Sequence, residues 1–158
     1  MQKSLAILAL LLMLAIAGVS GGAVAQKTDC YLYISNWETD KVYIKEPIQI
    51  GDTLFFGWMH SLEHIPWNEY YHIDKHLSLV LDAITFPAFG AGIPEDRGNI
   101  CYIKDGLIHM EQIDESFGEI VWLNSHYATR ELKINGQTIA TGSQLPEHTR
   151  LRLVIGRQ

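Results

Sequence analysis

The stretch that decides the fold class is Glu131-Leu132-Lys133-Ile134-Asn135-Gly136-Gln137-Thr138-Ile139-Ala140. Apolar and polar side chains alternate before the Asn-Gly pair, and Ile139 follows it. An Asn-Gly pair between such runs is the strongest short-range signal of a β-hairpin, because a type I′ turn needs positive φ at both central residues. The stretch therefore predicts two antiparallel strands joined by a two-residue turn.

The same period of two extends over the rest of the chain after Gln26, and no segment has the periodicity of an amphipathic helix. Short alternating strands separated by turn residues are typical of a β-sandwich or a partly closed barrel. We expect a single all-β antiparallel domain of one of these two kinds over residues 26–158. The segments expected to be strands are Tyr31–Ser35, Lys41–Lys45, Thr53–His60, Asn68–Ile73, Leu77–Thr85, Ile100–Lys104, Leu107–Met110, Glu119–Leu123, Glu131–Ile134, Gln137–Ala140 and Arg150–Ile155.

The N-terminal residues have the layout of a secretory signal peptide. Lys3 precedes an apolar run from Leu5 to Val19, and Ala23-Val24-Ala25 supplies the small residues of a cleavage site. The alternative is an uncleaved membrane anchor, but a bilayer span takes roughly 20 apolar residues and glycines interrupt this run. We therefore expect residues 1–25 to be a signal peptide and the mature domain to be periplasmic or otherwise extracytoplasmic.

The charge balance excludes two classes of partner. The 158 residues include 12 Lys+Arg and 18 Asp+Glu, for a formal net charge of −6. An acidic exported domain is a poor candidate for binding nucleic acid or anionic lipid. We expect no nucleic-acid partner, contact with a membrane only through an uncleaved N-terminal segment, and no cofactor.

Two cysteines, Cys30 and Cys101, are present in the chain. In an oxidising compartment the default for an even pair is a disulfide. Such a bond would close a long loop and stabilise the fold by about 4 kcal/mol on the chain-entropy model. We therefore expect a Cys30–Cys101 disulfide, although the sequence does not show that the two cysteines are adjacent.

Histidines and carboxylates crowd the segment from His60 to His72. On the strand Thr53–His60, His60 continues the apolar face made by the even positions, so it is expected at the rim of the core. Pro66 ends the strand character of the linking loop, and Glu69 follows on the next strand. If the two strands pair as a hairpin, Glu69 falls within reach of His60 or Ser61, and a His60–Glu69 contact would satisfy both groups. One interpretation is a ligand site; the other is a hydrogen-bonded structural corner.

Two kinds of chemistry are possible for the same segment. Ser61, either His60 or His64, and Glu69 could form a hydrolase triad, but no nucleophile elbow is present and neighbouring residues of a strand point to opposite faces. His72, Asp74 and His76 would align on one face of an extended strand and suit zinc or copper. They are weak candidates, because Asp74 lies in an expected turn; solvated turn residues are the alternative, and we assign no metal site.

A glycine-containing segment follows, from Phe86 to Gly98. Gly90 and Gly92 allow close approach of the backbone to a ligand, and Arg97 could help to bind an anion. The segment is not a phosphate-binding loop, because no lysine or following helix appears. A tight crossover between strands is the structural alternative.

Together these two segments resemble a known family. The resemblance rests on a strand that ends in His60-Ser61, on Pro66 and Glu69, and on the loop Phe89-Gly90-Ala91-Gly92-Ile93-Pro94. They resemble the family of domains of unknown function 1850, and the hairpin and last apolar strand within Leu132–Ile155 extend the resemblance over most of the mature chain.

The resemblance implies a small exported or membrane-tethered protein without an established activity. Genes of this family often lie beside those of TAXI-type tripartite ATP-independent periplasmic (TRAP) transporters, which implies an accessory role. We therefore expect a non-enzymatic binding domain for a small solute or a transporter component, with His60, Ser61, Glu69, Gly90, Gly92 and Arg97 as candidate ligand-binding residues. The alternatives are a metal-dependent or Ser/His hydrolase and a purely structural domain.

Overall fold

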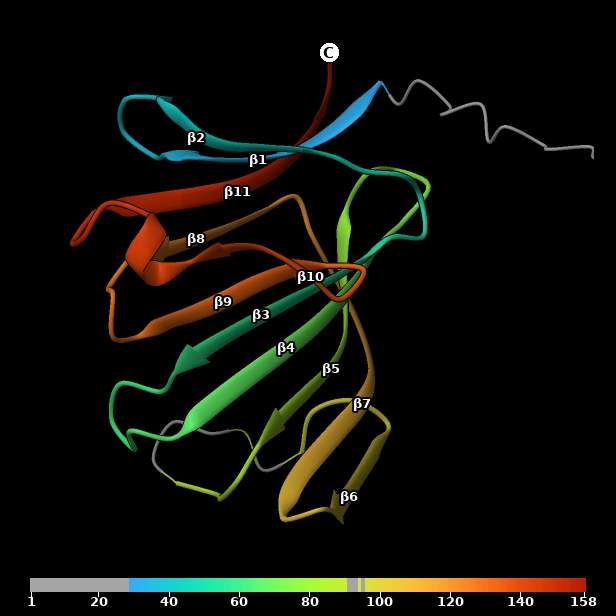
Figure 1. Cartoon of the computed structure of the whole chain (residues 1–158). Coiled ribbons are helices and arrows are strands. Elements are labelled where there is room, and N and C mark those ends of the chain that lie inside the picture. The colour runs from blue at the N-terminus through green and yellow to red at the C-terminus, as the bar shows by residue number, and fades with distance from the viewer. Residues whose placement is uncertain (1–28, 91–93, 95) are drawn as a thin grey trace, which may run out of the picture.

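The computed structural model describes residues 29–90, 94 and 96–158, and within them the chain folds almost entirely into strands (Figure 1). The elements are β1 (Cys30–Asn36), β2 (Val42–Pro47), β3 (Thr53–Met59), β4 (Pro66–Ile73), β5 (Leu79–Phe86), β6 (Ile100–Lys104), β7 (Leu107–Phe117), β8 (Glu119–Leu123), β9 (Thr129–Ile134), β10 (Gln137–Thr141), the 3₁₀ helix η1 (Gly142–Gln144) and β11 (Arg150–Arg157). Each segment expected to be a strand overlaps one, although Lys41, His60, Leu77 and Ser78 lie outside the strands.

The strands form two antiparallel sheets, which confirms the all-β sandwich. The small sheet has the order β2-β1-β11-β8, and the large sheet has the order β10-β9-β3-β4-β5-β7-β6. Neither sheet closes on itself, so the sandwich, and not the partly closed barrel, is the correct alternative. Figure 1 shows the small sheet above the long strands of the large one.

Between β7 and β8 the chain passes from the large sheet to the small one through a single residue. Gly118 alone separates Phe117, the end of β7 in the large sheet, from Glu119, the start of β8 in the small sheet. Strands that switch sheets through a bend make the corners of such sandwiches. β7 also extends beyond the expected Met110, because Gln112 and Asp114, at φ of 55° and 53°, form an irregularity that breaks the alternation without ending the strand.

Apolar side chains from both sheets fill the space between them. Leu32, Ile34 and Leu153 of the small sheet, like Ile73 and Ile84 of the large one, are 0% exposed. Burying each such side chain contributes about 1.5–3 kcal/mol, so this layer supplies most of the driving force for folding.

The Asn-Gly turn has the predicted geometry and also ties the hairpin to β3. Asn135 and Gly136 have φ of 49° and 78°, as a type I′ turn requires. Asn135 Oδ1 accepts a hydrogen bond from the Thr53 backbone N–H at 3.0 Å, and its Nδ2 donates to Asp52 at 2.8 Å. The hairpin that defines the fold class is thus held at the start of β3.

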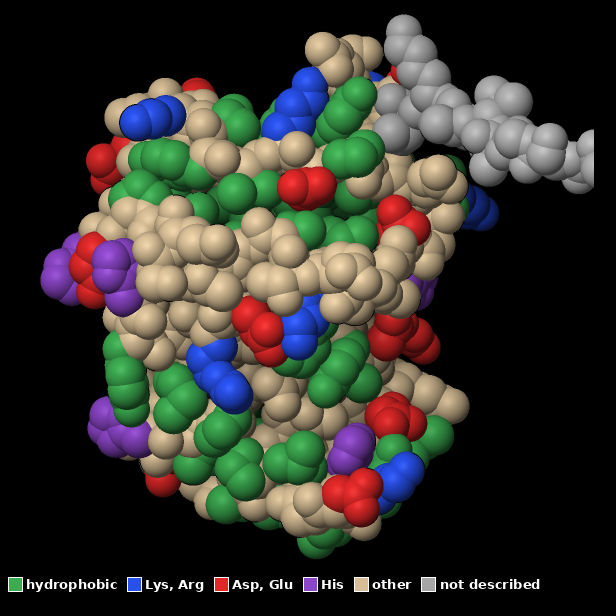
Figure 2. Space-filling view, in the orientation of Figure 1, with side chains coloured by type: hydrophobic (Ala, Val, Ile, Leu, Met, Phe, Trp, Pro, Cys, Tyr) green, Lys and Arg blue, Asp and Glu red, His purple; other side chains and the backbone are tan. Residues whose placement is uncertain are grey.

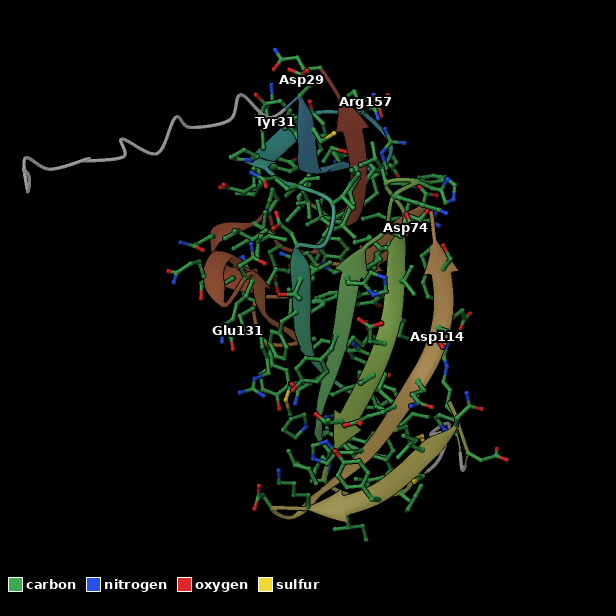
Figure 3. The ribbon with its side chains drawn as sticks, turned by 90° about the vertical axis from the view of Figure 1, so that its right-hand side faces the viewer. Asp29, Tyr31, Asp74, Asp114, Glu131 and Arg157 are labelled. Carbon is green, nitrogen blue, oxygen red and sulfur yellow. The ribbon has the colours of Figure 1, made fainter. Side chains whose placement is uncertain are left out.

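The expected Cys30–Cys101 disulfide is wrong for this fold, since no disulfide joins the two residues in the part of the chain that the structure describes. Cys30 begins β1 and pairs with Arg157 in the small sheet, whereas Cys101 lies on β6, at the edge of the large sheet. Figure 3 labels the neighbouring Asp29, Tyr31 and Arg157 at one end of the molecule, with β6 at the other. An even number of cysteines indicates pairing only where the topology brings the strands together.

The expected signal peptide, residues 1–25, lies outside the described residues. Within residues 29–90, 94 and 96–158, no helix is long and apolar enough to cross a membrane.

Candidate functional site

The pairing of β3 with β4 builds the centre of the candidate site. Phe56 pairs with Glu69, and Trp58 pairs with Trp67, so that alternate residues of both strands point between the sheets. Trp67 and Tyr71 are each 5% exposed, and Glu69 lies between them on the same face. The structure therefore places a carboxyl group in the apolar interior, as the alternation of the sequence predicted.

Three aromatic residues hold the Glu69 carboxyl. Its Oε2 accepts a hydrogen bond from the Tyr71 hydroxyl at 2.7 Å, and its Oε1 accepts one from the Trp67 indole N–H at 3.1 Å. Burial raises the pKa of Glu69 above its ordinary value, against the opposing effect of hydrogen bonds from Tyr71, Trp67 and Trp58 and of the Arg97 charge. Burial also raises the pKa of Tyr71, so its hydroxyl keeps the proton that it donates.

Glu69 and Tyr71 face a cavity of about 300 Å³ between the sheets, which we call the Glu69 cavity. Its walls come from β4, β5, β7 and β8 and from the segment between β5 and β6. The lining residues are Glu69, Tyr71, Leu81, Arg97, Phe117, Glu119, Ile120 and Val121.

The Glu69 cavity has an excess of negative charge. Glu69 and Glu119 are its acidic lining residues, and Arg97 is its one basic lining residue. The Arg97 guanidinium donates to Glu115, so its charge is already paired. Of the predicted ligand-binding residues, Glu69 and Arg97 thus line one cavity, which suits a cationic group better than the anion first expected for Arg97.

A second cavity of about 300 Å³ is lined by residues of β8, and we call it the Trp122 cavity. Its lining is almost wholly apolar, and it shares Ile120 and Val121 with the Glu69 cavity. The Trp122 ring packs edge-on against Phe56, with 5.2 Å between ring centroids. The other lining residues are Trp58, Leu123, Ala128 and Thr129.

His60 lies next to the site but does not bond to Glu69. Its half-buried ring lies 5.9 Å from the rings of Trp58 and Trp67, and its Nδ1 accepts a long hydrogen bond of 3.4 Å from the Glu63 N–H. No hydrogen bond or ion pair joins His60 to Glu69 in the structure. The link between them is Trp67, which contacts the His60 ring and donates to the Glu69 carboxylate.

Ser61 and Gly90 lie at the loop end of the β3–β4 hairpin. Ser61 is exposed, and no hydrogen bond connects it to His60 or His64, so the residues of the suggested triad are not assembled. A Cβ atom added to Gly90 would lie only 2.5 Å from Glu63 Cδ, so Gly90 packs against the β3–β4 loop. Gly92 lies outside the described residues.

The weak metal candidates do not converge. His72 Nδ1 bonds to Asp82 on β5 at 2.8 Å, whereas Asp74 Oδ1 accepts from the N–H groups of His76 and Ser78. Asp74 therefore stabilises the β4–β5 turn. Among the described residues, no group of three or more His, Cys, Asp or Glu side chains could hold a metal ion.

Sequence reasoning missed the contribution of β8 to the site. Glu119, Ile120 and Val121 line the Glu69 cavity because β8 crosses to the small sheet, and alternation within a strand carries no information about that crossing. The common face of Glu69 and Tyr71 follows from their spacing of two residues, although Tyr71 was not among the candidate site residues.

The family comparison matches the part of the chain that builds this site. The model of the family described as "Domain of unknown function (DUF1850)" matches residues 54–140, more than half of the 158 residues. The chain belongs to the DUF1850 family. The match covers the strands of the large sheet together with β8. It therefore includes β4, which bears Glu69, and β8, which bears Val121. No curated protein and no solved structure matches the chain.

Replacing Glu69 with glutamine is expected to alter how the stability of this DUF1850 domain depends on pH. A folded-state pKa raised above the ordinary 4.5 means that, as pH rises from that value, the unfolded chain loses its proton first and the free energy of unfolding falls. Glu69→Gln removes that loss, so its stability relative to the native protein should increase as pH rises above 4.5. Urea unfolding at several pH values measures the difference.

The matched control is Glu38→Gln, which makes the same change in the exposed β1–β2 turn. Its stability relative to the native protein should show no such trend. Equal pH trends for the two variants would contradict the assignment of a buried, raised-pKa carboxyl to Glu69.

Proposed function

We propose that this chain is an exported, non-enzymatic binding domain that takes up a cationic group in the Glu69 cavity and serves as an accessory component of a TAXI-type TRAP transporter. The observation that carries the proposal is the Glu69 carboxyl itself. It lies against a cavity between the sheets, and within the described residues no ion pair neutralises it. A cavity with a few convergent polar groups and a perturbed pKa is the usual mark of a ligand site.

Cation binding follows from the chemistry of the Glu69 cavity. A buried carboxylate is costly unless a cation or several hydrogen bonds compensate for its charge. Tyr71, Trp67 and Trp58 supply hydrogen bonds but no charge, and Arg97 is held by Glu115. An ammonium or guanidinium group in the cavity would supply the missing charge, so binding should strengthen as pH rises through the raised pKa of Glu69.

The preference for a cation over an anion would come from the Glu69 cavity and not from the charge of the molecular surface. On the face drawn in Figure 2, acidic and basic side chains are scattered among hydrophobic ones. The transporter role is supported by the family resemblance, and the extracytoplasmic location by the signal-peptide pattern of residues 1–25.

A thermal-shift screen of the mature domain tests the binding site. The panel contains small amines and guanidines, such as agmatine and lysine amide, and dicarboxylates of similar size. A cation that binds should raise the melting midpoint by about 4 °C when present at about ten times its Kd, whereas the dicarboxylates should leave the midpoint unchanged.

Glu69→Gln should abolish that shift, and Glu38→Gln, far from the cavity, should retain it. A cation-induced shift that survives Glu69→Gln, or an equal response to dicarboxylates, would rule out the Glu69 cavity as the binding site.

A further inference from the structure

β8 is an edge strand of the small sheet, with β11 as its one strand partner among the described residues. The pairing leaves specific main-chain groups unused. The Asn124 N–H donates to Thr149 O at 2.8 Å, which continues the β8–β11 ladder. This bond shows that the main-chain groups of Asn124, and hence those of Trp122 and Ile120, face β11. In an antiparallel pair, alternate residues direct their N–H and C=O groups away from the partner. Those of Glu119, Val121 and Leu123 therefore point to the free edge.

The sequence of β8 does not protect this edge. Natural edge strands commonly carry lysine, proline or a bulge that blocks pairing with another chain. The edge strand β2 of the same sheet has Lys45 and Pro47, whereas β8 reads Glu-Ile-Val-Trp-Leu. Leu123 at its end is 65% exposed. The free edge of β8 thus has the features of a surface that pairs with a further strand.

Residues of this edge strand line both cavities. Val121, whose main-chain groups face the free edge, lines the Glu69 cavity and the Trp122 cavity alike. A strand paired with β8 would direct every second side chain toward the large sheet, at intervals of about 6.6 Å. Two successive inward side chains of such a strand would therefore meet the two cavities.

We propose that the occupant of the site is an extended polypeptide segment of a partner protein, added to the small sheet along the free edge of β8. The inference rests on the proposed function and specifies its ligand: the cationic group is a lysine or arginine side chain of that segment. The inward neighbour of this side chain, two residues away, is apolar and enters the Trp122 cavity. Main-chain pairing supplies affinity, and the two pockets supply specificity, as in other cases of strand addition.

The charges of the cavity select this partner. The Glu69 carboxyl favours a basic inward residue, and the Trp122 cavity, lined by Phe56, Trp58 and Trp122, favours an aliphatic or aromatic one. A small amine could satisfy Glu69, but it would leave the N–H and C=O groups of the β8 edge to solvent. An extended backbone satisfies both features at once.

Fluorescence anisotropy with labelled heptapeptides tests the inference. Each peptide has leucine at one inward position, lysine two residues away, and threonine at the remaining positions. Two peptides are made, one with leucine before lysine and one with lysine before leucine. One order should bind the native domain, and replacing its lysine with glutamate should weaken binding about tenfold or more. Val121→Pro, which removes one N–H from the free edge, should also weaken binding about tenfold.

The matched control for Val121→Pro is Val121→Thr, which keeps the N–H and should bind within about twofold of the native domain. Proline is tolerated where its missing N–H faces the open side of an edge strand, and a melting curve verifies that the variant folds. A second measurement needs no substitution. The bound peptide should slow hydrogen exchange at the amides of Val121 and Leu123, which point away from β11 and have no strand partner among the described residues.

The outcomes separate this inference from the proposed function. If small cations bind through Glu69 while the lysine peptides bind no differently to Val121→Pro and to Val121→Thr, strand pairing is overturned and the binding site stands. If the peptides bind and protect the β8 amides but Glu69→Gln has no effect, the Glu69 site is overturned. If neither peptides nor small cations bind, both proposals are overturned.

Discussion

Trp67→Ala is expected to lower the free energy of unfolding by about 3–5 kcal/mol, the usual cost of deleting a buried tryptophan side chain. The Trp67 ring stacks on Phe86 with centroids 4.9 Å apart and an interplanar angle of 6°, and it also contacts Trp58 and His60. Its loss would leave a cavity between the sheets and remove one hydrogen-bond donor from Glu69. Urea unfolding followed by near-ultraviolet circular dichroism measures the change.

Trp67→Phe is the control that separates packing from hydrogen bonding. It keeps an aromatic ring against Phe86 but removes the indole N–H, so a loss of about 1–2 kcal/mol is expected. Should Trp67→Ala cost no more than Trp67→Phe, the ring stack would not be the feature that holds the β3–β4 hairpin to the core.

Asn124→Asp is the second substitution with a large expected effect. Asn124 is 0% exposed, and its Nδ2 lies 3.1, 3.2 and 2.9 Å from the carbonyl oxygens of Gly142, Leu145 and Pro146. In the aspartate variant a carboxylate oxygen would face these carbonyls and its charge would be buried. We expect a loss of about 3–5 kcal/mol at pH 7.

The pH dependence of Asn124→Asp follows from the same contacts. Burial and the surrounding carbonyls would raise the pKa of the new carboxyl, and its neutral form can donate one hydrogen bond to a carbonyl. The loss of stability relative to the native protein should therefore shrink as pH falls from about 7 to about 4.5. Urea unfolding at the two pH values measures it.

Asn36→Asp is a matched control for Asn124→Asp. Asn36 uses its Oδ1 to accept hydrogen bonds from the N–H groups of Glu38 and Thr39, both at 2.8 Å, and a carboxylate accepts them equally well. Its substitution should change the stability by less than about 0.5 kcal/mol. Equal costs at positions 36 and 124 would show that the buried Asn124 amide does not hold the η1 segment in place.

The strands could be predicted from the sequence because the alternation of apolar and polar residues shows which side chains of a strand are buried and which are exposed. Leu151 and Leu153 are both fully buried on β11, as their spacing of two residues predicts, and Asn135-Gly136 forms the expected turn. The division of the strands between two sheets could not be predicted. Alternation shows which face of a strand is buried, but it does not identify the strand beside it.

The same distinction explains what was predicted of the candidate site. The common face of Trp67, Glu69 and Tyr71 follows from alternation within β4. The approach of Glu119 and Arg97 to Glu69 depends on the crossing at Gly118 and on the course of the segment after β5. The disulfide prediction was wrong for the same reason, since an even number of cysteines does not show whether β1 and β6 lie side by side.

The position of β11 determines when the domain can fold. β11 comes last in this sequence but lies between β1 and β8, and its pairing joins Cys30 to Arg157. During synthesis, the apolar faces of Leu32 on β1 and Ile120 on β8 must wait for residues 150–157 before the small sheet can form. Pairing of such distant residues makes folding slow, on the order of milliseconds to seconds. The unfolded interval before the small sheet forms is when aggregation competes most strongly with folding.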